Sequence, residues 1–145
     1  MDMGRVLVVD DDRAIRELLH VVMEMEGHQV ATAANGEEAL AFLTAAELPW
    51  VVVMDVMMPR LSGVEVCGRL LDQADAAAVR HTVVLMTAGL LEDIDRPAAA
   101  RFIIRKPFDV EWVARLVSTL VEQIATSEVA AACAAPPEAA LAASA

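Results

Sequence analysis

Basic residues and cysteines are both scarce in this chain. Its 145 residues include 11 Lys and Arg against 22 Asp and Glu, which gives a formal net charge of −11. Such a charge argues against binding to nucleic acid or to an anionic membrane surface. The two cysteines, Cys67 and Cys133, are too few for a disulfide framework and suit a reducing compartment. We therefore expect a cytoplasmic protein without a nucleic-acid or membrane partner.

Long apolar runs are absent as well. Hydrophobic residues make up 57% of the chain, yet no apolar stretch is long enough to span a membrane. The first apolar run, Val6 to Val9, is interrupted at once by aspartates, so no signal peptide is expected. The length fits one domain, which we place at residues 1–125. The Ala-rich segment 126–145 is a compositionally separate tail that can extend the last helix.

Short apolar runs alternate with segments of helical spacing. Each run is too short for a helix and is rich in β-branched residues, as buried parallel strands are. The predicted strands are Val6–Val9, Gln29–Ala33, Val51–Met54, Val83–Met86 and Phe102–Ile104. The predicted helices start after Asp12, at Asn35-Gly36, at Ser62 and at Val110. This alternation predicts an α/β fold with a parallel sheet and helices on both faces.

Acidic residues follow two of these predicted strands directly. Asp10 and Asp11 come after the first apolar run, and Asp55 ends the third. In an open α/β sheet, ligands bind outside the carboxyl ends of the strands, so these carboxylates should converge. Clustered carboxylates repel one another unless a cation lies between them. The pattern therefore indicates a divalent metal and phosphate chemistry.

Four short motifs occur in a fixed order, each at the end of a strand. They are Asp10-Asp11, Asp55 with Pro59 and Gly63 in the pattern D-x-x-x-P-x-x-x-G, Thr87-Ala88, and Lys106-Pro107. In this set the sequence resembles a CheY-like response-regulator receiver domain of two-component signalling, from about Arg5 to Ile124. The resemblance implies a flavodoxin-like, doubly wound sheet of five parallel strands in the order 2-1-3-4-5.

The resemblance also implies roles for the acidic residues. Asp55 would be the phosphoacceptor, because a carboxylate can act as a nucleophile and form an acyl phosphate. Asp11 and Asp55 would bind Mg²⁺ directly, and Asp10 would reach it through water. The main-chain carbonyl of Met57 would be the third protein ligand.

Three further motif positions would act on the phosphoryl group. Lys106 would neutralise its oxygens, Thr87 would donate a hydrogen bond to one of them, and the Ala88 amide would assist. In the family the Lys106–Pro107 bond is cis, which would turn the lysine inward. Pro59, Gly63 and Pro107 would therefore act by shaping loops.

The sequence departs from the family pattern on the last strand. The family's switch aromatic lies three residues before the lysine, and Ile103 holds that position here. Phe102 is one residue earlier, and the strand period of two places it on the opposite face. Thr87 and Ile103 are therefore the candidate switch pair, and an aromatic flip is not expected.

A second departure is the short segment Gly89–Arg101. It contains Pro97, and a proline inside a helix costs about 3 kcal/mol. We expect a shortened fourth helix of at most a turn or two and hence an atypical output surface. Phosphorylation would act by ordering this segment through Thr87 and Ala88.

Three functions compete for this set of residues. The first is a receiver, phosphorylated by a histidine kinase or a phosphotransfer protein and signalling to an unknown protein partner as a monomer or weak dimer. Such a protein catalyses at most its own phosphorylation and dephosphorylation. The second is an aspartyl-phosphate phosphohydrolase, which commonly carries an acid two residues after the nucleophile; Met57 holds that place and cannot transfer protons. The third is a binding-only scaffold with vestigial phosphorylation.

Overall fold

The computed structural model of the protein describes residues 4–73, 80–89 and 100–132. Its strands are β1 (Arg5–Val9), β2 (Gln29–Ala33), β3 (Val51–Asp55), β4 (Thr82–Thr87) and β5 (Ala100–Arg105). They form one sheet in the order β2-β1-β3-β4-β5, and every neighbouring pair is parallel. The predicted sheet and its strand order are confirmed.

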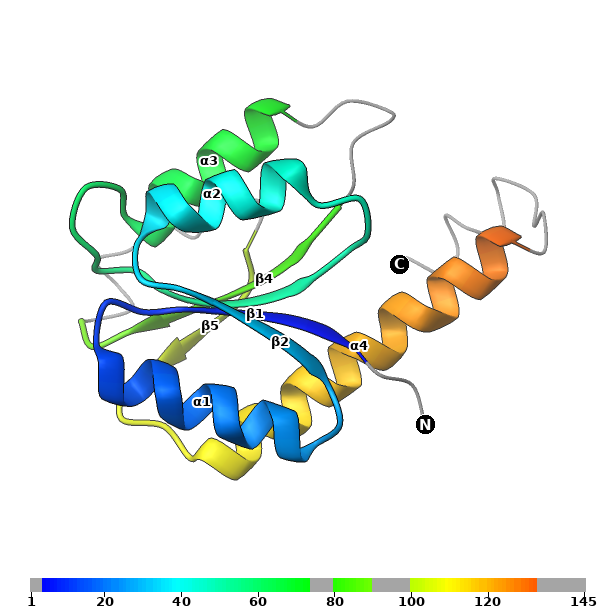
Figure 1. Cartoon of the computed structure of the whole chain (residues 1–145), viewed down its shortest axis with the longest axis horizontal. Coiled ribbons are helices and arrows are strands. Elements are labelled where there is room, and N and C mark those ends of the chain that lie inside the picture. The colour runs from blue at the N-terminus through cyan, green and yellow to red at the C-terminus, as the bar shows by residue number, and fades with distance from the viewer. Residues whose placement is uncertain (1–3, 74–79, 90–99, 133–145) are drawn as a thin grey trace.

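Among the described residues, two helices cover each face of this sheet (Figure 1). They are α1 (Arg13–Met25), α2 (Gly36–Ala45), α3 (Gly63–Gln73) and α4 (Val110–Ala132). In Figure 1, α2 and α3 lie on one side of the sheet, and α1 and α4 lie on the other. The short helix expected between β4 and β5 falls at 90–99, outside the described residues, and so does the ordering expected there.

Alternating strand residues supply two separate cores. Leu7, Val52 and Leu85 pack with α2 and α3, whereas Val8, Val53 and Val84 pack with α1 and α4. All six of these side chains are buried. The two-sided burial explains why the strands are nearly continuous apolar runs. Cys67 of α3 lies in the first core, where burial raises the pKa of its thiol to about 11.

Local capping sets the helix boundaries near the functional edge. The side chain of Asp12 accepts hydrogen bonds from the N–H groups of Ala14 and Ile15, as an N-cap does. Asn35 caps α2 in the same way. At the far end of α1, Gly27 has φ = 92°, a conformation that suits glycine just after a helix. The predicted starts of α1 and α2 are confirmed.

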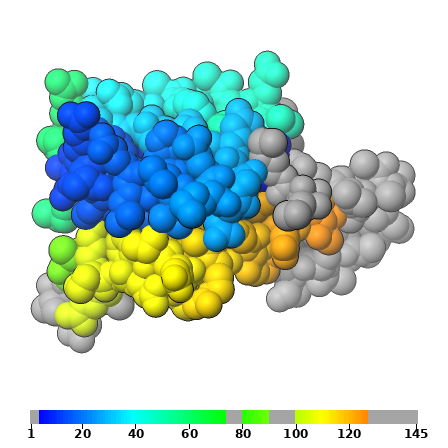
Figure 2. Space-filling view, turned by 60° about the horizontal axis from the view of Figure 1, so that its bottom comes forward, coloured from blue at the N-terminus to red at the C-terminus, as the bar shows by residue number. Residues whose placement is uncertain are grey.

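The last helix is the longest element of the described chain. Its buried side chains include Val113, Val117 and Leu120, which pack under the sheet beside α1. In Figure 2, α1 (blue) and α4 (yellow to orange) lie side by side and form one face of the molecule. The helix ends at Ala132, beyond residue 125, and the division of the chain at that residue stays a prediction. Within the described ranges, no helix combines the length and the apolar character needed to cross a membrane.

Two histidines, a buried one at position 28 and a half-buried one at position 81, tie segments of the chain together. His28 accepts a hydrogen bond at Nδ1 from the Gly4 N–H, 3.3 Å away, and its Nε2 lies 3.0 Å from the Ser118 hydroxyl. His81 accepts at Nδ1 from the Trp50 N–H, 3.0 Å away, and donates from Nε2 to the Leu43 carbonyl. An imidazole that accepts at Nδ1 is neutral. Burial lowers the pKa of both histidines, which keeps them in this form.

These histidines predict a loss of stability in mild acid. The histidines of the unfolded chain have a pKa of about 6.5. At a pH well above this value they are neutral in both the folded and the unfolded chain, so they do not make the free energy of unfolding depend on pH there. Below this value, the unfolded chain binds protons that folded His28 and His81 do not bind, so stability falls as pH falls. The melting temperature should therefore drop between about pH 7.5 and about pH 5.5.

Histidine variants separate the contribution of His28 and His81 from that of other groups that titrate in mild acid. His28→Asn combined with His81→Asn should melt lower at neutral pH but with a flatter pH dependence. His20→Asn is the control, because His20 lies on α1, where its imidazole pairs with Glu24 one turn away. A wild-type melting temperature that stays constant over this pH range would contradict the assignment.

Candidate phosphoacceptor and metal site

The strand register brings the two buried acids to neighbouring positions. Val9 of β1 pairs with Met54 of β3, so Asp10 and Asp55 follow as the next residues on adjacent strands. Asp10 still belongs to the sheet, since its N–H donates to the Ala33 carbonyl at 3.2 Å. Both side chains are buried, with 0% of Asp10 and 7% of Asp55 exposed. The convergence predicted for the strand ends is confirmed for these two acids.

Asp10 is held by hydrogen bonds on both carboxylate oxygens. Oδ1 accepts from the Asp12 N–H at 2.8 Å, and Oδ2 accepts from the Lys106 ammonium at 3.0 Å. Burial raises the pKa of Asp10, and the charge of Asp55 adds to this, although the Asp12 and Lys106 hydrogen bonds oppose it. A raised pKa marks a carboxylate whose negative charge is only partly compensated.

Lys106 bridges the two buried carboxylates. Its Nζ lies 3.0 Å from Asp10 Oδ2 and 3.0 Å from Asp55 Oδ2, and its side chain is largely buried. Burial lowers the pKa of Lys106, but the hydrogen bonds and charges of Asp55 and Asp10 outweigh it and raise the pKa overall. The lysine is therefore a fixed cation at the carboxyl edge of the sheet. The Lys106–Pro107 peptide bond is cis, as the resemblance implies.

Asp11 completes an acidic cluster that opens to solvent. One carboxylate oxygen each from Asp10, Asp11 and Asp55 lies within 4.8 Å of the others. Asp11 is exposed, in contrast to the two other acids. Oxygen donors alone make up this set, which suits a hard cation such as Mg²⁺ rather than a softer metal. The residues present therefore fit the ion that the resemblance implies.

The loop after Asp55 folds back onto its own strand. The Met57 N–H donates to Asp55 Oδ1 at 3.0 Å, and the Gly63 N–H donates to the Val56 carbonyl at 3.0 Å. The Met57 side chain is 70% exposed, so its backbone is what faces the site. A Cβ atom at position 63 would lie 2.6 Å from the Asp55 carbonyl oxygen. Close backbone packing therefore requires glycine at position 63.

The end of β4 supplies the polar residue next to Asp55. Met86 is the register partner of Asp55, and Thr87 follows it. Thr87 is buried, and its hydroxyl accepts the Gly89 N–H at 3.0 Å. Its carbonyl accepts the Lys106 N–H at 2.7 Å, which ties the ends of β4 and β5 together. Ala88 is exposed beside it.

The face assignment on β5 agrees with the strand period. Ile103 pairs with Leu85 and packs against the core under α2 and α3. Phe102 pairs with Val84, a residue of the opposite core, and is 38% exposed. No aromatic ring therefore occupies the position of Ile103. The switch role of Thr87 and Ile103 stays a prediction.

Sequence reasoning missed two residues that shape this edge. Arg16 of α1 donates from Nη1 to the Asp10 main-chain carbonyl at 2.8 Å. Gly36, interpreted from sequence as part of a turn and helix entry, lies so close to the Leu61 carbonyl that a Cβ atom would collide with it. The Gly36 contact joins segments that meet only in the fold, and the Arg16 contact, although it spans only six residues, belongs to no motif quoted from the sequence.

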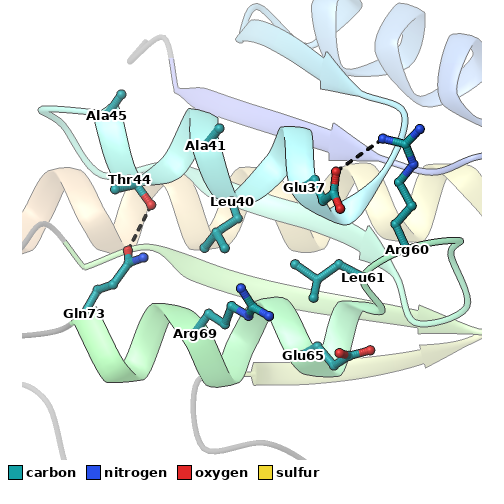
Figure 3. A pocket seen from close by; sticks show the side chains of 10 residues that line it. All are labelled: Glu37, Leu40, Ala41, Thr44, Ala45, Arg60, Leu61, Glu65, Arg69 and Gln73. Atoms are coloured by element: carbon teal, nitrogen blue, oxygen red, sulfur yellow. Dashed lines mark hydrogen bonds and ion pairs between the residues drawn. The ribbon is translucent and has the colours of Figure 1, made fainter.

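A groove between α2 and α3 lies beside the loop that follows Asp55 (Figure 3). One end is crossed by Glu37 and Arg60, 3.3 Å apart, and the other by Thr44 and Gln73, 2.9 Å apart. The Glu37 and Arg60 side chains are more than half exposed, so this ion pair contributes little. Leu61 is 5% exposed and packs with α2. Burial of this leucine therefore anchors the loop more than the ion pair does.

Comparison with known proteins places the chain in a protein family. The sequence model of the response regulator receiver domain family matches residues 6–118. Response regulator MprA of Mycolicibacterium vanbaalenii is 43% identical over 112 residues, which are 74% of this chain and 46% of that protein. MprA of Mycobacterium sp. strain KMS is 39% identical over 129 residues, 86% of this chain and 53% of that protein. The chain thus spans about half the length of these curated relatives.

Solved structures agree with this match. The receiver domain of Francisella response regulator 1452 has a TM-score of 0.73 at 26% identity, covering 83% of this chain and 98% of that one. TrrA of Thermotoga maritima, solved in complex with Mg²⁺ and BeF, has a TM-score of 0.68 at 35% identity, covering 81% and 99%. The fold, the acidic edge and the family match lead to one conclusion: this chain belongs to the response regulator receiver domain family.

Proposed function

We propose that Asp55 accepts a phosphoryl group in a Mg²⁺-dependent reaction and that this modification is the signal. The observation that carries the proposal is the bridging of Asp55 and Asp10 by Lys106, with Asp11 in the same cluster. A buried carboxylate beside one fixed ammonium group can attack phosphorus while that cation stabilises the transferred charge. The chain therefore acts as a signalling protein that modifies itself.

The transfer has a simple balance. A carboxylate oxygen of Asp55 attacks phosphorus, and the bond from phosphorus to the donor breaks. With phosphohistidine the broken bond is P–N, and the ring leaves as neutral imidazole because its other nitrogen already carries a proton. With acetyl phosphate, acetate leaves. Lys106 stays protonated and pairs with phosphoryl oxygens as its contact with Asp55 loosens. Thr87 follows the register partner of Asp55, and its hydroxyl would donate a hydrogen bond to a phosphoryl oxygen.

The acidic cluster would hold the metal. Asp11 and Asp55 would be direct ligands, with the Met57 carbonyl as a third and Asp10 through water. When bound, Mg²⁺ supplies positive charge that offsets the carboxylates and the incoming phosphoryl oxygens. The chain's contribution is to keep three carboxylates close together, which by itself is unfavourable.

The donor would dock along α1. Leu18, Val21 and Met25 are 48%, 52% and 81% exposed and recur at helical spacing on that helix, which starts at the acidic edge. An exposed apolar stripe of this kind marks a protein contact. TrrA, which is 35% identical to this chain, has been solved in complex with histidine kinase ThkA. We propose a histidine kinase or phosphotransfer protein as the donor in the cytoplasm, a monomeric or weakly dimeric receiver, and a separate downstream partner.

Intact-mass measurement with acetyl phosphate tests the proposal. Wild-type protein with Mg²⁺ should gain the mass of a single phosphoryl group, and EDTA should prevent the gain. Continuous release of inorganic phosphate without an adduct would favour the phosphohydrolase. The absence of any adduct and of any phosphate release would favour the binding-only scaffold. Either result would overturn the proposed function.

Mg²⁺ should also stabilise the unphosphorylated protein. It would relieve the repulsion among Asp10, Asp11 and Asp55, and a ligand at a hundredfold excess over its Kd stabilises by about 2.7 kcal/mol. Thermal melts with and without Mg²⁺ measure this, and Asp11→Ala should remove most of the difference. Asp72→Ala is the control, because Asp72 lies on α3 outside the acidic cluster. Superimposable wild-type melts with and without Mg²⁺ would rule out a metal site of this kind.

A further inference from the structure

Arg16 makes one contact that the family motifs do not cover. Its Nη1 donates to the Asp10 main-chain carbonyl at 2.8 Å, reaching back from the second turn of α1 to the end of β1. That carbonyl belongs to the peptide group that joins Asp10 to Asp11. A peptide group is planar, so fixing its oxygen fixes the plane from which Asp11 projects.

The other contacts of this turn leave Asp11 less constrained than Asp10. Asp10 is held by the Ala33 carbonyl through its N–H and by Asp12 and Lys106 through its carboxylate. Asp11 is exposed, and among the described residues its side chain has no hydrogen-bond or ion-pair partner. The direction of Asp11 therefore depends on the peptide group before it and on the helix cap at Asp12 after it.

We infer that Arg16 is a positioning residue of the acidic site, whose guanidinium orients the Asp10–Asp11 peptide group so that Asp11 faces the metal. The inference rests on the proposed function and adds a residue to it. Arginine suits this role because its planar fork holds a donor at the end of a long side chain, and its charge also offsets the acidic cluster. Replacing a residue that orients a metal ligand typically weakens the affinity for the metal by 10–100-fold.

Arg13 provides a matched control for the charge. It lies on the same helix, three residues before Arg16, and replacing it removes the same single positive charge. Its guanidinium pairs with Glu17 at 2.8 Å, and its side chain is 81% exposed. Arg13→Met should therefore leave the Kd for Mg²⁺ within about twofold, whereas Arg16→Met should weaken it by about tenfold or more.

Titration of Mg²⁺ into the intact chain, followed by the amide resonances of the site, measures these constants without requiring phosphorylation. Arg16→Lys keeps the charge but not the fork and should give an intermediate Kd. At saturating Mg²⁺, Arg16→Met should still accept phosphate on Asp55, because it does not contact that carboxylate. A melting temperature lowered by Arg16→Met with the Kd unchanged would show a merely structural residue and would overturn the inference.

The remaining outcomes are also decisive. If Arg16→Met does not fold, the decision falls on Arg16→Lys: a Kd at least about threefold weaker than wild type supports the inference, and an equal Kd overturns it. If Arg13→Met and Arg16→Met weaken Mg²⁺ binding equally, the loss of affinity comes from the lost charge alone. That result would overturn the inference as well. Wild-type protein that fails to bind Mg²⁺ would instead contradict the proposed function.

Discussion

Replacing Asp55 with asparagine should abolish the phosphoryl adduct completely. The amide has nearly the same shape as the carboxylate, but it lacks the nucleophilic oxygen that would form the acyl phosphate. The fold should persist, since Asp10 keeps its hydrogen bonds to Asp12 and Lys106. Intact mass after incubation with acetyl phosphate and Mg²⁺ measures the effect, and circular dichroism reports the fold.

Asp12→Asn is the matched control for this variant. Asp12 is a neighbouring carboxylate that caps α1, and asparagine caps helices about as well as aspartate does. This control should be phosphorylated like the wild type. An adduct of equal yield in Asp55→Asn would show that another residue accepts the phosphate.

Replacing Gly63 with alanine should destabilise the protein by about 1–3 kcal/mol and slow phosphorylation. The new Cβ would lie 2.6 Å from the Asp55 carbonyl oxygen and 3.1 Å from Leu85 Cδ2. Relief of this overlap requires the end of β3 or the start of α3 to move, and Asp55 moves with it. Chemical denaturation gives the loss of stability, and the initial rate of adduct formation gives the functional loss.

Gly68→Ala, one turn further along α3, is expected to have the opposite effect. A Cβ there would meet nothing within 4 Å, and alanine favours a helix interior over glycine by about 1 kcal/mol. This variant should be more stable than the wild type and should be phosphorylated normally. Equal stabilities for Gly63→Ala and wild type would show that the backbone packing around Asp55 tolerates a side chain.

The backbone of the site could be predicted from the sequence because each part has a local signal. The apolar runs rich in β-branched residues predicted the strands, and their alternation with helical segments predicted that the strands are parallel. Since parallel strands end at the same edge, Asp10 and Asp55 had to approach each other. The caps at Asp12 and Asn35 were equally local, because a side-chain oxygen that bonds a nearby N–H needs no distant partner.

Contacts between distant segments could not be predicted in the same way. Lys106 reaches Asp10 across 96 positions of sequence, and only the family motif placed it at the site. Gly36 belongs to no motif quoted from the sequence, and its role depends on how closely the loop at Leu61 approaches the start of α2. The Arg16 contact spans only six residues, but it too belongs to no such motif. His28 and His81 had no ligand-like spacing, and their hydrogen-bond partners Gly4, Ser118, Trp50 and Leu43 are distant in sequence.

Mapping the phosphoryl group to a single residue tests the central claim most directly. The wild-type protein would be phosphorylated with acetyl phosphate and Mg²⁺, the acyl phosphate trapped by borohydride reduction, and the modified position located by fragmentation of the peptides. The account predicts that Asp55 alone is converted. Modification of Asp11 or of another acidic residue in place of Asp55, or no reducible acyl phosphate at all, would contradict it.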